Sequence, residues 1–346
     1  MLSDRFIPLL ILLTLLLSAC SRQPEIHNQR LLVFGTIIDI SIVGVDKNTA
    51  NNAFKIIEDD FKYMHEAWHA WQPGALGRIN NLLPTTASFT IAPSMLPVIQ
   101  KATALSDQSN HLFNPAIGNL IRAWGFHSND LPTKLPDQKT IHELVKQNPT
   151  MDDLELNGIT MRSRNSAMLL DMGAFAKGYG IDVGIENLRK LGIDNAIINA
   201  GGDLRAIGKK GDRNWRIGVR HPRNNSILAS IEMQGDESIF TSGDYERFFD
   251  HEGKRYHHII DPRTGYPADK TTSVTVIHSD GATADAAATA LFIAGPEQWH
   301  AIARQMNIKY VMLIDKHGHI HMNPAMQKRI RFVTDTQPEI TISEPL

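Results

Sequence analysis

Residues 169–183 have the sequence Leu169-Leu170-Asp171-Met172-Gly173-Ala174-Phe175-Ala176-Lys177-Gly178-Tyr179-Gly180-Ile181-Asp182-Val183, and the other motifs of the chain serve this segment. The short apolar run at residues 167–170 predicts a buried strand. Apolar side chains then recur at helical spacing from residue 173 to residue 191. Asp171 therefore lies where a strand passes into a helix.

The start of that helix is a candidate anion site. The first N–H groups of a helix have no partner within the helix, and they attract anionic groups such as phosphate. Gly173 and Gly178 allow a ligand to approach the backbone, and Lys177 adds a positive charge one turn in. The segment indicates a phosphate-bearing ligand beside a carboxylate, although an aspartate before a helix is also common as a plain N-cap.

Composition restricts the class of protein. The chain has 346 residues with a formal net charge of −2, enough for one large core or two joined lobes. Nucleic-acid binding normally needs a broad basic surface, which this balance of charge does not supply. A small charged ligand fits the composition better.

The N-terminus has the features of an export signal. An apolar run at residues 6–17 is too short to span a bilayer and ends in Leu17-Ser18-Ala19-Cys20, which resembles the bacterial lipobox. Cys20 is then the predicted lipidation site, and as the only cysteine it excludes disulfides and cysteine catalysis. Ser21 after it favours transfer to the outer membrane. We expect a lipoprotein signal peptide at residues 1–19, a lipidated N-terminus and tether at 20–30, one enzymatic domain at 31–335 and a polar tail at 336–346.

Two histidine patterns offer alternative metal sites. His65-Glu66-Ala67-Trp68-His69 matches the zinc-peptidase pattern His-Glu-x-x-His, but no third ligand follows at the usual spacing, so a surface or packing role is the competing interpretation. His317, His319 and His321 alternate, as on one face of a strand. They could bind a metal or belong to a solvated hairpin.

Three further segments have composition that suits a ligand site. A loop at residues 113–126, rich in Gly, Pro and aromatic residues, can form the wall of a flat aromatic site or close the edge of a core. The paired glycines at residues 201–202 indicate a bulge or a closely approached backbone. Asp285 and Thr289 lie four apart on a predicted helix, so that both project from one face, unless Thr289 bonds back to the Asp285 carbonyl.

Five motifs, in order along the chain, resemble those of the ApbE family of FAD:protein FMN transferases. They are Leu170-Asp171-Met172-Gly173-Ala174-Phe175-Ala176-Lys177-Gly178-Tyr179, Asn199-Ala200-Gly201-Gly202-Asp203, Ser242-Gly243-Asp244-Tyr245, His258-Ile259-Ile260-Asp261-Pro262-Arg263-Thr264-Gly265 and Ala284-Asp285-Ala286-Ala287-Ala288-Thr289-Ala290. The resemblance extends over about residues 31–330. It implies an α+β fold with a tunnelling-fold-like mixed sheet at its core.

The same resemblance implies an activity and a set of site residues. The enzyme would use Mg²⁺ to cleave the pyrophosphate of FAD, attach FMN to a Thr or Ser hydroxyl of a target redox protein and release AMP. The implied metal ligands are the carbonyl of Ala174 and the side chains of Asp285 and Thr289, and the residue nearest the chemistry is His258. The implied flavin contacts are Phe34, Trp71, Ala116, Ile117, Gly118, Asp171, Lys177 and Ile259. Phe34 stands where a Met is usual, and Ala288 where some members have a second acidic ligand.

These ligand types suit magnesium, which prefers a few hard oxygen ligands and completes its shell with water and phosphate oxygens. Two other functions remain open for the same site: hydrolysis of FAD to FMN and AMP, and flavin binding without turnover. With the export signal, we expect a lipid-anchored protein on the periplasmic side of a bacterial inner or outer membrane. Its acceptor would be an exported or membrane redox subunit.

Overall fold

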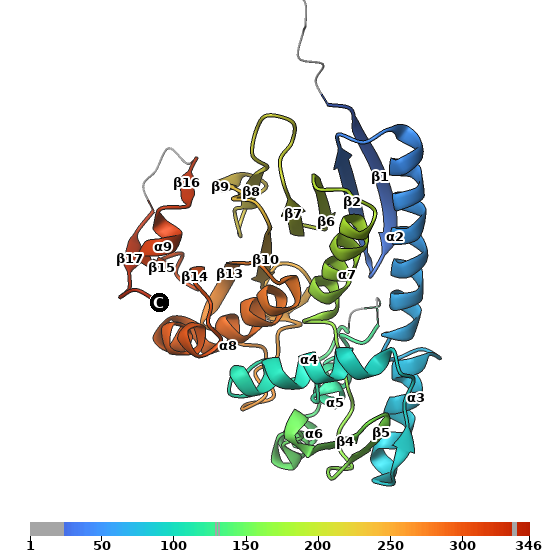
Figure 1. Cartoon of the computed structure of the whole chain (residues 1–346). Coiled ribbons are helices and arrows are strands. Elements are labelled where there is room, and N and C mark those ends of the chain that lie inside the picture. The colour runs from blue at the N-terminus through green and yellow to red at the C-terminus, as the bar shows by residue number, and fades with distance from the viewer. Residues whose placement is uncertain (1–23, 129, 131, 334–337) are drawn as a thin grey trace, which may run out of the picture.

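The computed structural model describes residues 24–128, 130, 132–333 and 338–346 (Figure 1). The predicted signal peptide, the lipidation site Cys20 and Ser21 lie outside these residues. None of the helices in the described residues has both the length and the apolar character needed to cross a bilayer.

A mixed sheet of nine strands, in the order β1-β2-β6-β7-β10-β13-β14-β15-β17, runs through the described part of the chain. All neighbours pair antiparallel except β15 and β17, which are parallel. Strands far apart in the sequence therefore lie side by side. The bounds are β1 (Ile26–Val33), β2 (Thr36–Val43), β6 (Ala196–Ala200), β7 (Asp203–Ile207), β10 (Glu237–Gly243), β13 (Thr271–His278), β14 (Tyr310–Asp315), β15 (Ile320–Met322) and β17 (Ile340–Ile342).

Three long helices pack in the main hydrophobic core against this sheet: α2 (Lys47–Ala67), α7 (Ala176–Lys190) and α8 (Gly281–Gln305). Asp46 caps α2 by accepting hydrogen bonds from the N–H groups of Asn48 and Thr49. A kink at Gly295, where φ is 70°, and Pro296 divides α8, since proline cannot continue the hydrogen-bond ladder. Figure 1 shows α7 and α8 meeting near the centre of the molecule.

A small sheet of β16 (Ile330–Phe332), β9 (Ile227–Glu232) and β8 (Arg216–Arg220) packs through a second core against β7, β10 and β14. The result is a helix layer, a large mixed sheet and a small sheet. This is the α+β class that the sequence predicted.

Residues 68–170 form the lower part of the molecule in Figure 1. A third core cluster, which includes Trp124 and Phe249, joins this part to the hairpin of β11 (Phe248–His251) and β12 (Lys254–His257). The other elements are α3 (Ala75–Leu82), η1 (Leu83–Thr85), β3 (Phe89–Thr90), α4 (Met95–Gln108), α5 (Gly118–Ala123), α6 (Gln138–Gln147), η2 (Met151–Asp153), β4 (Leu154–Asn157), β5 (Thr160–Ser163) and, near the C-terminus, α9 (Pro324–Gln327).

Both ends of the predicted domain need correction. β1 begins at Ile26, so residues 26–30, assigned to the tether, belong to the sheet, where they pair with β2. Their polar composition fits an edge strand, which is only half buried. Residues 340–342, assigned to a polar tail, form β17 and pair in parallel with β15, through the backbone and with all three residues exposed.

Candidate functional site

The segment before α7 pairs through its backbone with residues 115–118, which belong to the loop suggested above as a wall of the ligand site. The N–H of Gly118 donates to the Leu169 carbonyl at 2.8 Å, and the N–H of Asp171 donates to the Pro115 carbonyl at 2.8 Å. A Cβ at residue 118 would lie 2.6 Å from the Leu169 carbonyl oxygen, so only glycine fits. Ala116, Ile117 and Gly118 are buried in this pairing, and their contact with flavin stays a prediction.

Asn80, for which the sequence gave no indication of a role, is a second support of this segment. Its buried amide donates to the carbonyls of Ala70 at 3.2 Å and Leu170 at 2.9 Å, and its Oδ1 accepts from the N–H of Leu170 at 2.8 Å. One side chain thus pairs with Leu170 as a neighbouring strand would. No sequence pattern marks it, because its partner lies 90 residues away.

Asp171 does not cap α7. A turn over residues 172–175 intervenes, and Asp171 Oδ1 accepts from the N–H of Gly173 at 2.7 Å. Burial raises the pKa of Asp171, while the Gly173 N–H, Arg247 and His69 act in the opposite direction. The carboxyl therefore lies in a partly desolvated place between two cationic or ionisable side chains.

A hydrogen bond between α7 and α8 replaces a regular backbone hydrogen bond at the start of α7. The N–H of Gly178, which would bond to the Ala174 carbonyl in a regular helix, donates instead to Asp285 Oδ2 at 3.0 Å. No backbone N–H of the described residues donates to the Ala174 carbonyl oxygen. A Cβ at residue 178 would lie 2.2 Å from the Gly281 carbonyl oxygen, so this approach requires glycine.

The same contact changes which groups could bind an anion at the start of α7. The N–H groups of Ala176, Gly178 and Tyr179 already donate to Met172, Asp285 and Phe175. A phosphate at the helix start therefore depends mainly on the Lys177 side chain, since the Asp285 carboxylate takes the place of the anion.

Lys177 lies between two buried carboxylates. Its Nζ bonds to Asp203 Oδ2, and Asp203 Oδ1 accepts from the N–H of Thr241 at 2.9 Å. Burial acts to lower the pKa of Lys177, but Asp203 and Asp285 raise it overall, so the ammonium stays charged. Burial raises the pKa of Asp285 to about 7, with Asp203 adding to the rise and Lys177 opposing it. When all three groups are ionised, the carboxylates of Asp203 and Asp285 outweigh the ammonium of Lys177, and the net negative charge favours binding of a cation.

Thr289 faces the same region from the next turn of α8. Its Oγ1 lies 3.3 Å from Ser242 Oγ on β10, rather than being occupied by the Asp285 carbonyl. Four elements, α7, α8, β7 and β10, therefore bring together the carboxylates of Asp203 and Asp285 and the hydroxyls of Ser242 and Thr289. Asp203 and Ser242 were not among the predicted site residues, although both belong to the ApbE-like motifs.

His258 has a defined tautomer. Its Nδ1 lies 3.3 Å from the Arg247 carbonyl oxygen, which can only accept, so Nδ1 carries the proton and Nε2 has the lone pair. Burial, with the nearby His257 and Arg247, lowers the pKa of His258 to about 3. The ring is therefore neutral near pH 7 and has a free Nε2 lone pair, but a pKa this low makes the unliganded imidazole a weak base. Its neighbour Ile259 is buried in the main core.

Aromatic side chains line α2 and the loop after it. Phe34, at φ 55° in the turn between β1 and β2, stacks on Trp68 with ring centroids 6.3 Å apart and packs against Gly180 of α7. Trp71 meets His127 edge to face at 5.6 Å. These two rings are the described candidates for stacking on a flavin, and their contact with it stays a prediction.

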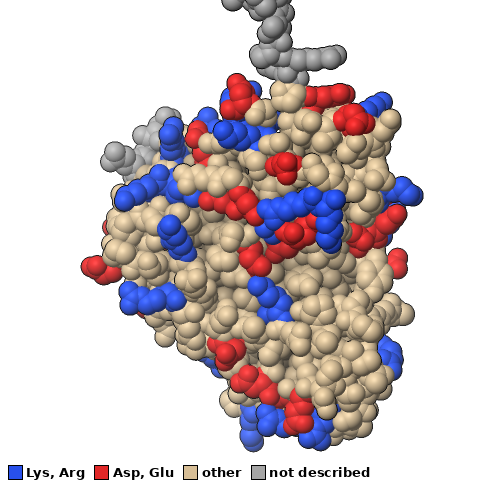
Figure 2. Space-filling model, viewed as in Figure 1, with Lys and Arg blue, Asp and Glu red and all other residues tan. Residues whose placement is uncertain are grey.

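The zinc-peptidase interpretation is not supported. The helix α2 ends at Ala67, so His69 lies beyond it, and His69 Nδ1 accepts from the N–H of Trp71 at 3.1 Å. Among the described residues, no third His, Cys, Asp or Glu joins His65 and His69 in a ligand cluster. On the face shown in Figure 2, Lys and Arg are interspersed with Asp and Glu.

Known proteins are similar to this chain in sequence and in fold. The model of the ApbE family matches residues 34–312. The FAD:protein FMN transferase of Rhodobacter capsulatus is 39% identical over 301 residues, 87% of this chain and 58% of that protein, so the chain spans little more than half of that relative. A FAD:protein FMN transferase of Klebsiella pneumoniae is 34% identical over 248 residues, 70% of this chain and 75% of that one.

Solved structures agree. The ApbE protein of Thermotoga maritima superposes with a TM-score of 0.81 at 27% identity, over 89% of this chain and all of that chain. The flavin transferase ApbE of Vibrio cholerae gives a TM-score of 0.77 at 26% identity, over 88% and 99%. The predicted fold is therefore confirmed.

Proposed function

The chain belongs to the ApbE family, and from this premise we propose that it transfers FMN from FAD to a Thr or Ser hydroxyl of a target redox protein and releases AMP. One observation carries the proposal: the Gly178 N–H bonds to Asp285, which leaves the Ala174 carbonyl without a backbone donor beside a buried carboxylate. Relatives named FAD:protein FMN transferase support the choice of reaction.

The residues of the cluster fit Mg²⁺. A carbonyl oxygen of Ala174, a carboxylate of Asp285 and a hydroxyl of Thr289 are three hard oxygen donors, and a magnesium site usually takes few from the protein. When bound, the ion would neutralise charge on the pyrophosphate. Ala288, buried on α8, adds no further ligand.

The remaining roles fall to side chains of this chain. Lys177 stays charged through Asp203 and so binds a phosphate oxygen, while Asp203 fixes its position. The acceptor oxygen forms the new bond to the FMN phosphorus as the bond from that phosphorus to the AMP oxygen breaks. Nε2 of neutral His258 takes the proton of the hydroxyl, and Nδ1–H bonded to the Arg247 carbonyl keeps the ring oriented.

The test uses the full chain with FAD, Mg²⁺ and candidate Thr-containing acceptor proteins. We expect a fluorescent acceptor band, a mass increase equal to FMN minus water, and AMP in equal amount. Asp285→Asn should lower transfer at least ~100-fold, since a fixed charge at the reacting phosphate is removed. Asp280→Asn is the matched control: Asp280 caps the same helix by accepting from the Thr283 N–H, and Asn caps equally well.

Three outcomes would redirect the proposal. AMP released without a labelled acceptor indicates hydrolysis of FAD. Tight FAD binding without AMP indicates a flavin-binding protein. Equal activity in the two aspartate variants removes Asp285 from the site, and unchanged transfer in His258→Asn removes His258 from the role of base.

We further propose that the enzyme acts on exported or membrane redox subunits while anchored by lipid at Cys20. The lipobox-like sequence supports this proposal. Cys20→Ala should abolish incorporation of a labelled fatty acid into the protein, and labelling equal to that of the wild type would contradict the anchor.

A further inference from the structure

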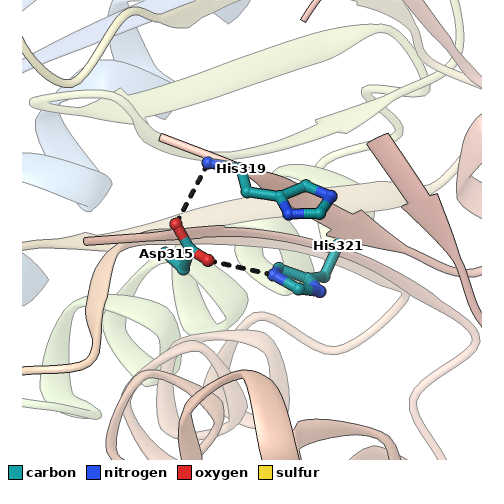
Figure 3. Close-up of side chains that lie close together, drawn as sticks. All are labelled: Asp315, His319 and His321. Carbon is teal, nitrogen blue, oxygen red and sulfur yellow. Dashed lines mark hydrogen bonds and ion pairs between the residues drawn. The ribbon is translucent and has the colours of Figure 1, made fainter. Parts of the chain in front are cut away.

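Asp315, His319 and His321 form a cluster of potential metal ligands where β14 turns into β15, the two strands next to the edge strand β17 of the nine-stranded sheet (Figure 3). Asp315 ends β14, His319 directly precedes β15, and His321 is the middle residue of β15. One ligand atom from each side chain lies within 4.8 Å of the others, and among the described residues this is the only such group of three His, Cys, Asp or Glu. No residue of the candidate active site belongs to it.

The carboxylate is already fixed for a ligand role. Asp315 Oδ1 accepts from the backbone N–H groups of His317 at 2.8 Å and His319 at 3.0 Å, which sets its orientation. Oδ2 then lies 3.3 Å from Nε2 of His321. Two ligands of a tetrahedral zinc, each about 2.0–2.1 Å from the ion, are separated by about 3.3 Å. This pair has that spacing.

The second imidazole has the surroundings of a metal ligand. The ring centroids of His319 and His321 lie 4.7 Å apart at an interplanar angle of 31°, so both imidazoles face the same small region. Nε2 of His319 lies 3.0 Å from Thr341 Oγ1. Hydrogen bonding of one ring nitrogen to an outer partner typically orients a metal-bound histidine.

The cluster is sheltered but not closed. The side chains of Asp315 and His321 are 12% and 16% exposed, and that of His319 is 27% exposed. The exposed Glu339 carboxylate lies 3.9 Å from His319 Nδ1 and, like water, can supply a fourth ligand. Two imidazole nitrogens with one carboxylate favour zinc and related transition ions over Mg²⁺ or Ca²⁺.

We propose that Asp315, His319 and His321 bind a Zn²⁺-type transition metal ion, separate from the oxygen-ligand site on α7 and α8. The ion joins β14 to β15. Through Thr341, beside His319, it also steadies β17, which pairs with only three residues of β15. The site is structural, and it stands whether or not the chain transfers flavin.

The test is calorimetric titration of the metal-free full chain with Zn²⁺ in excess Mg²⁺, so that hard-oxygen sites are filled. We expect about one Zn²⁺ per chain. His321→Asn and His319→Gln should each lower the affinity at least ~10-fold and abolish the Zn²⁺-dependent rise in the unfolding midpoint. His317→Asn is the matched control, because His317 lies exposed in the same turn and outside the cluster.

His65→Asn controls for the other histidine pair. Circular dichroism identifies any variant that fails to fold, and His319→Gln, the more exposed position, then carries the comparison. Absence of stoichiometric Zn²⁺ binding, or equal affinity in the His317 and His321 variants, overturns the proposal. Loss of binding in His65→Asn with retention in His321→Asn does so too.

Discussion

Replacing Asn80 by aspartate tests the hydrogen bonds that hold Leu170, the residue before Asp171. The change keeps the shape of the side chain and its acceptor for the Leu170 N–H. It removes the two N–H donors that bond to Ala70 at 3.2 Å and Leu170 at 2.9 Å, and it places a negative charge on a side chain in a position that is only 7% exposed. Asn81→Asp is the matched control, because Asn81 is the next residue and is exposed.

The magnitude follows from these contacts. Leaving a buried partner unsatisfied costs about 1–3 kcal/mol, and burying a charge adds to that, so we expect Asn80→Asp to lose ~3–5 kcal/mol of unfolding free energy at pH 8. Burial raises the pKa of the introduced carboxyl in the folded state. Folding then binds a proton, so the loss becomes smaller as the pH falls, because the protonated acid can donate one hydrogen bond.

Urea denaturation at pH 8 and pH 5.5 measures both effects. Asn81→Asp should stay within about 0.5 kcal/mol of the wild type. The reasoning is refuted if the two variants lose equal stability at pH 8, or if the deficit of Asn80→Asp does not depend on pH. Flavin transfer should also fall in Asn80→Asp, because Asn80 holds Leu170 and thereby positions the adjacent Asp171.

Three other predictions concern neighbouring contacts. Gly178→Ala places a methyl group 2.2 Å from a backbone oxygen, about 1 Å closer than ordinary contact, and should reduce flavin transfer ~100-fold. Gly184→Ala on the same helix meets only side-chain atoms and should retain transfer. Equal losses of transfer in the two variants, measured by the acceptor-band assay, contradict the prediction. Burial lowers the pKa of His257 from 6.5. Below about pH 6.5 the unfolded chain therefore binds a proton that the folded chain does not, and the free energy of unfolding should fall as the pH drops. His257→Gln should make this pH dependence less steep in urea titrations, and an unchanged pH dependence contradicts the prediction. Trp124→Phe removes the Nε1–H bond to the Gly265 carbonyl at 2.7 Å and should cost about 1–3 kcal/mol, measured by urea denaturation; no loss contradicts the bond.

Prediction of the local elements succeeded where neighbouring residues decide them. Helical spacing after residue 173 predicted α7, and the small residues around Asp285 and Thr289 predicted a closely packed helix, now part of α8. Prediction failed at the two edge strands of the large sheet, β1 and β17. Both are stabilised by pairing with a neighbouring strand, and the polar residues of an edge strand have the composition of an unstructured tether.

The alternation of His317, His319 and His321 suggested one strand face. A turn after β14 instead places His317 outside the cluster, while Asp315, which the pattern did not include, completes it. A spacing in sequence therefore gave two of the three ligands. The third depends on how the hairpin turns.

Sequence alone predicted the helices α7 and α8 and residue types suited to phosphate and a hard cation, because these predictions depend on adjacent residues. The buried strand predicted at residues 167–170 was wrong: Leu169 makes only an isolated bridge to Ile117, and the Asn80 side chain pairs with Leu170 in place of a strand. Only the tertiary structure decided that the Gly178 N–H bonds to Asp285, 107 residues away, that Asp203 neutralises Lys177, and that Asn80 holds Leu170. Such contacts depend on how helices and strands pack around the core. A buried hydrogen bond or charge is assigned its partner only when that packing has removed water from both groups.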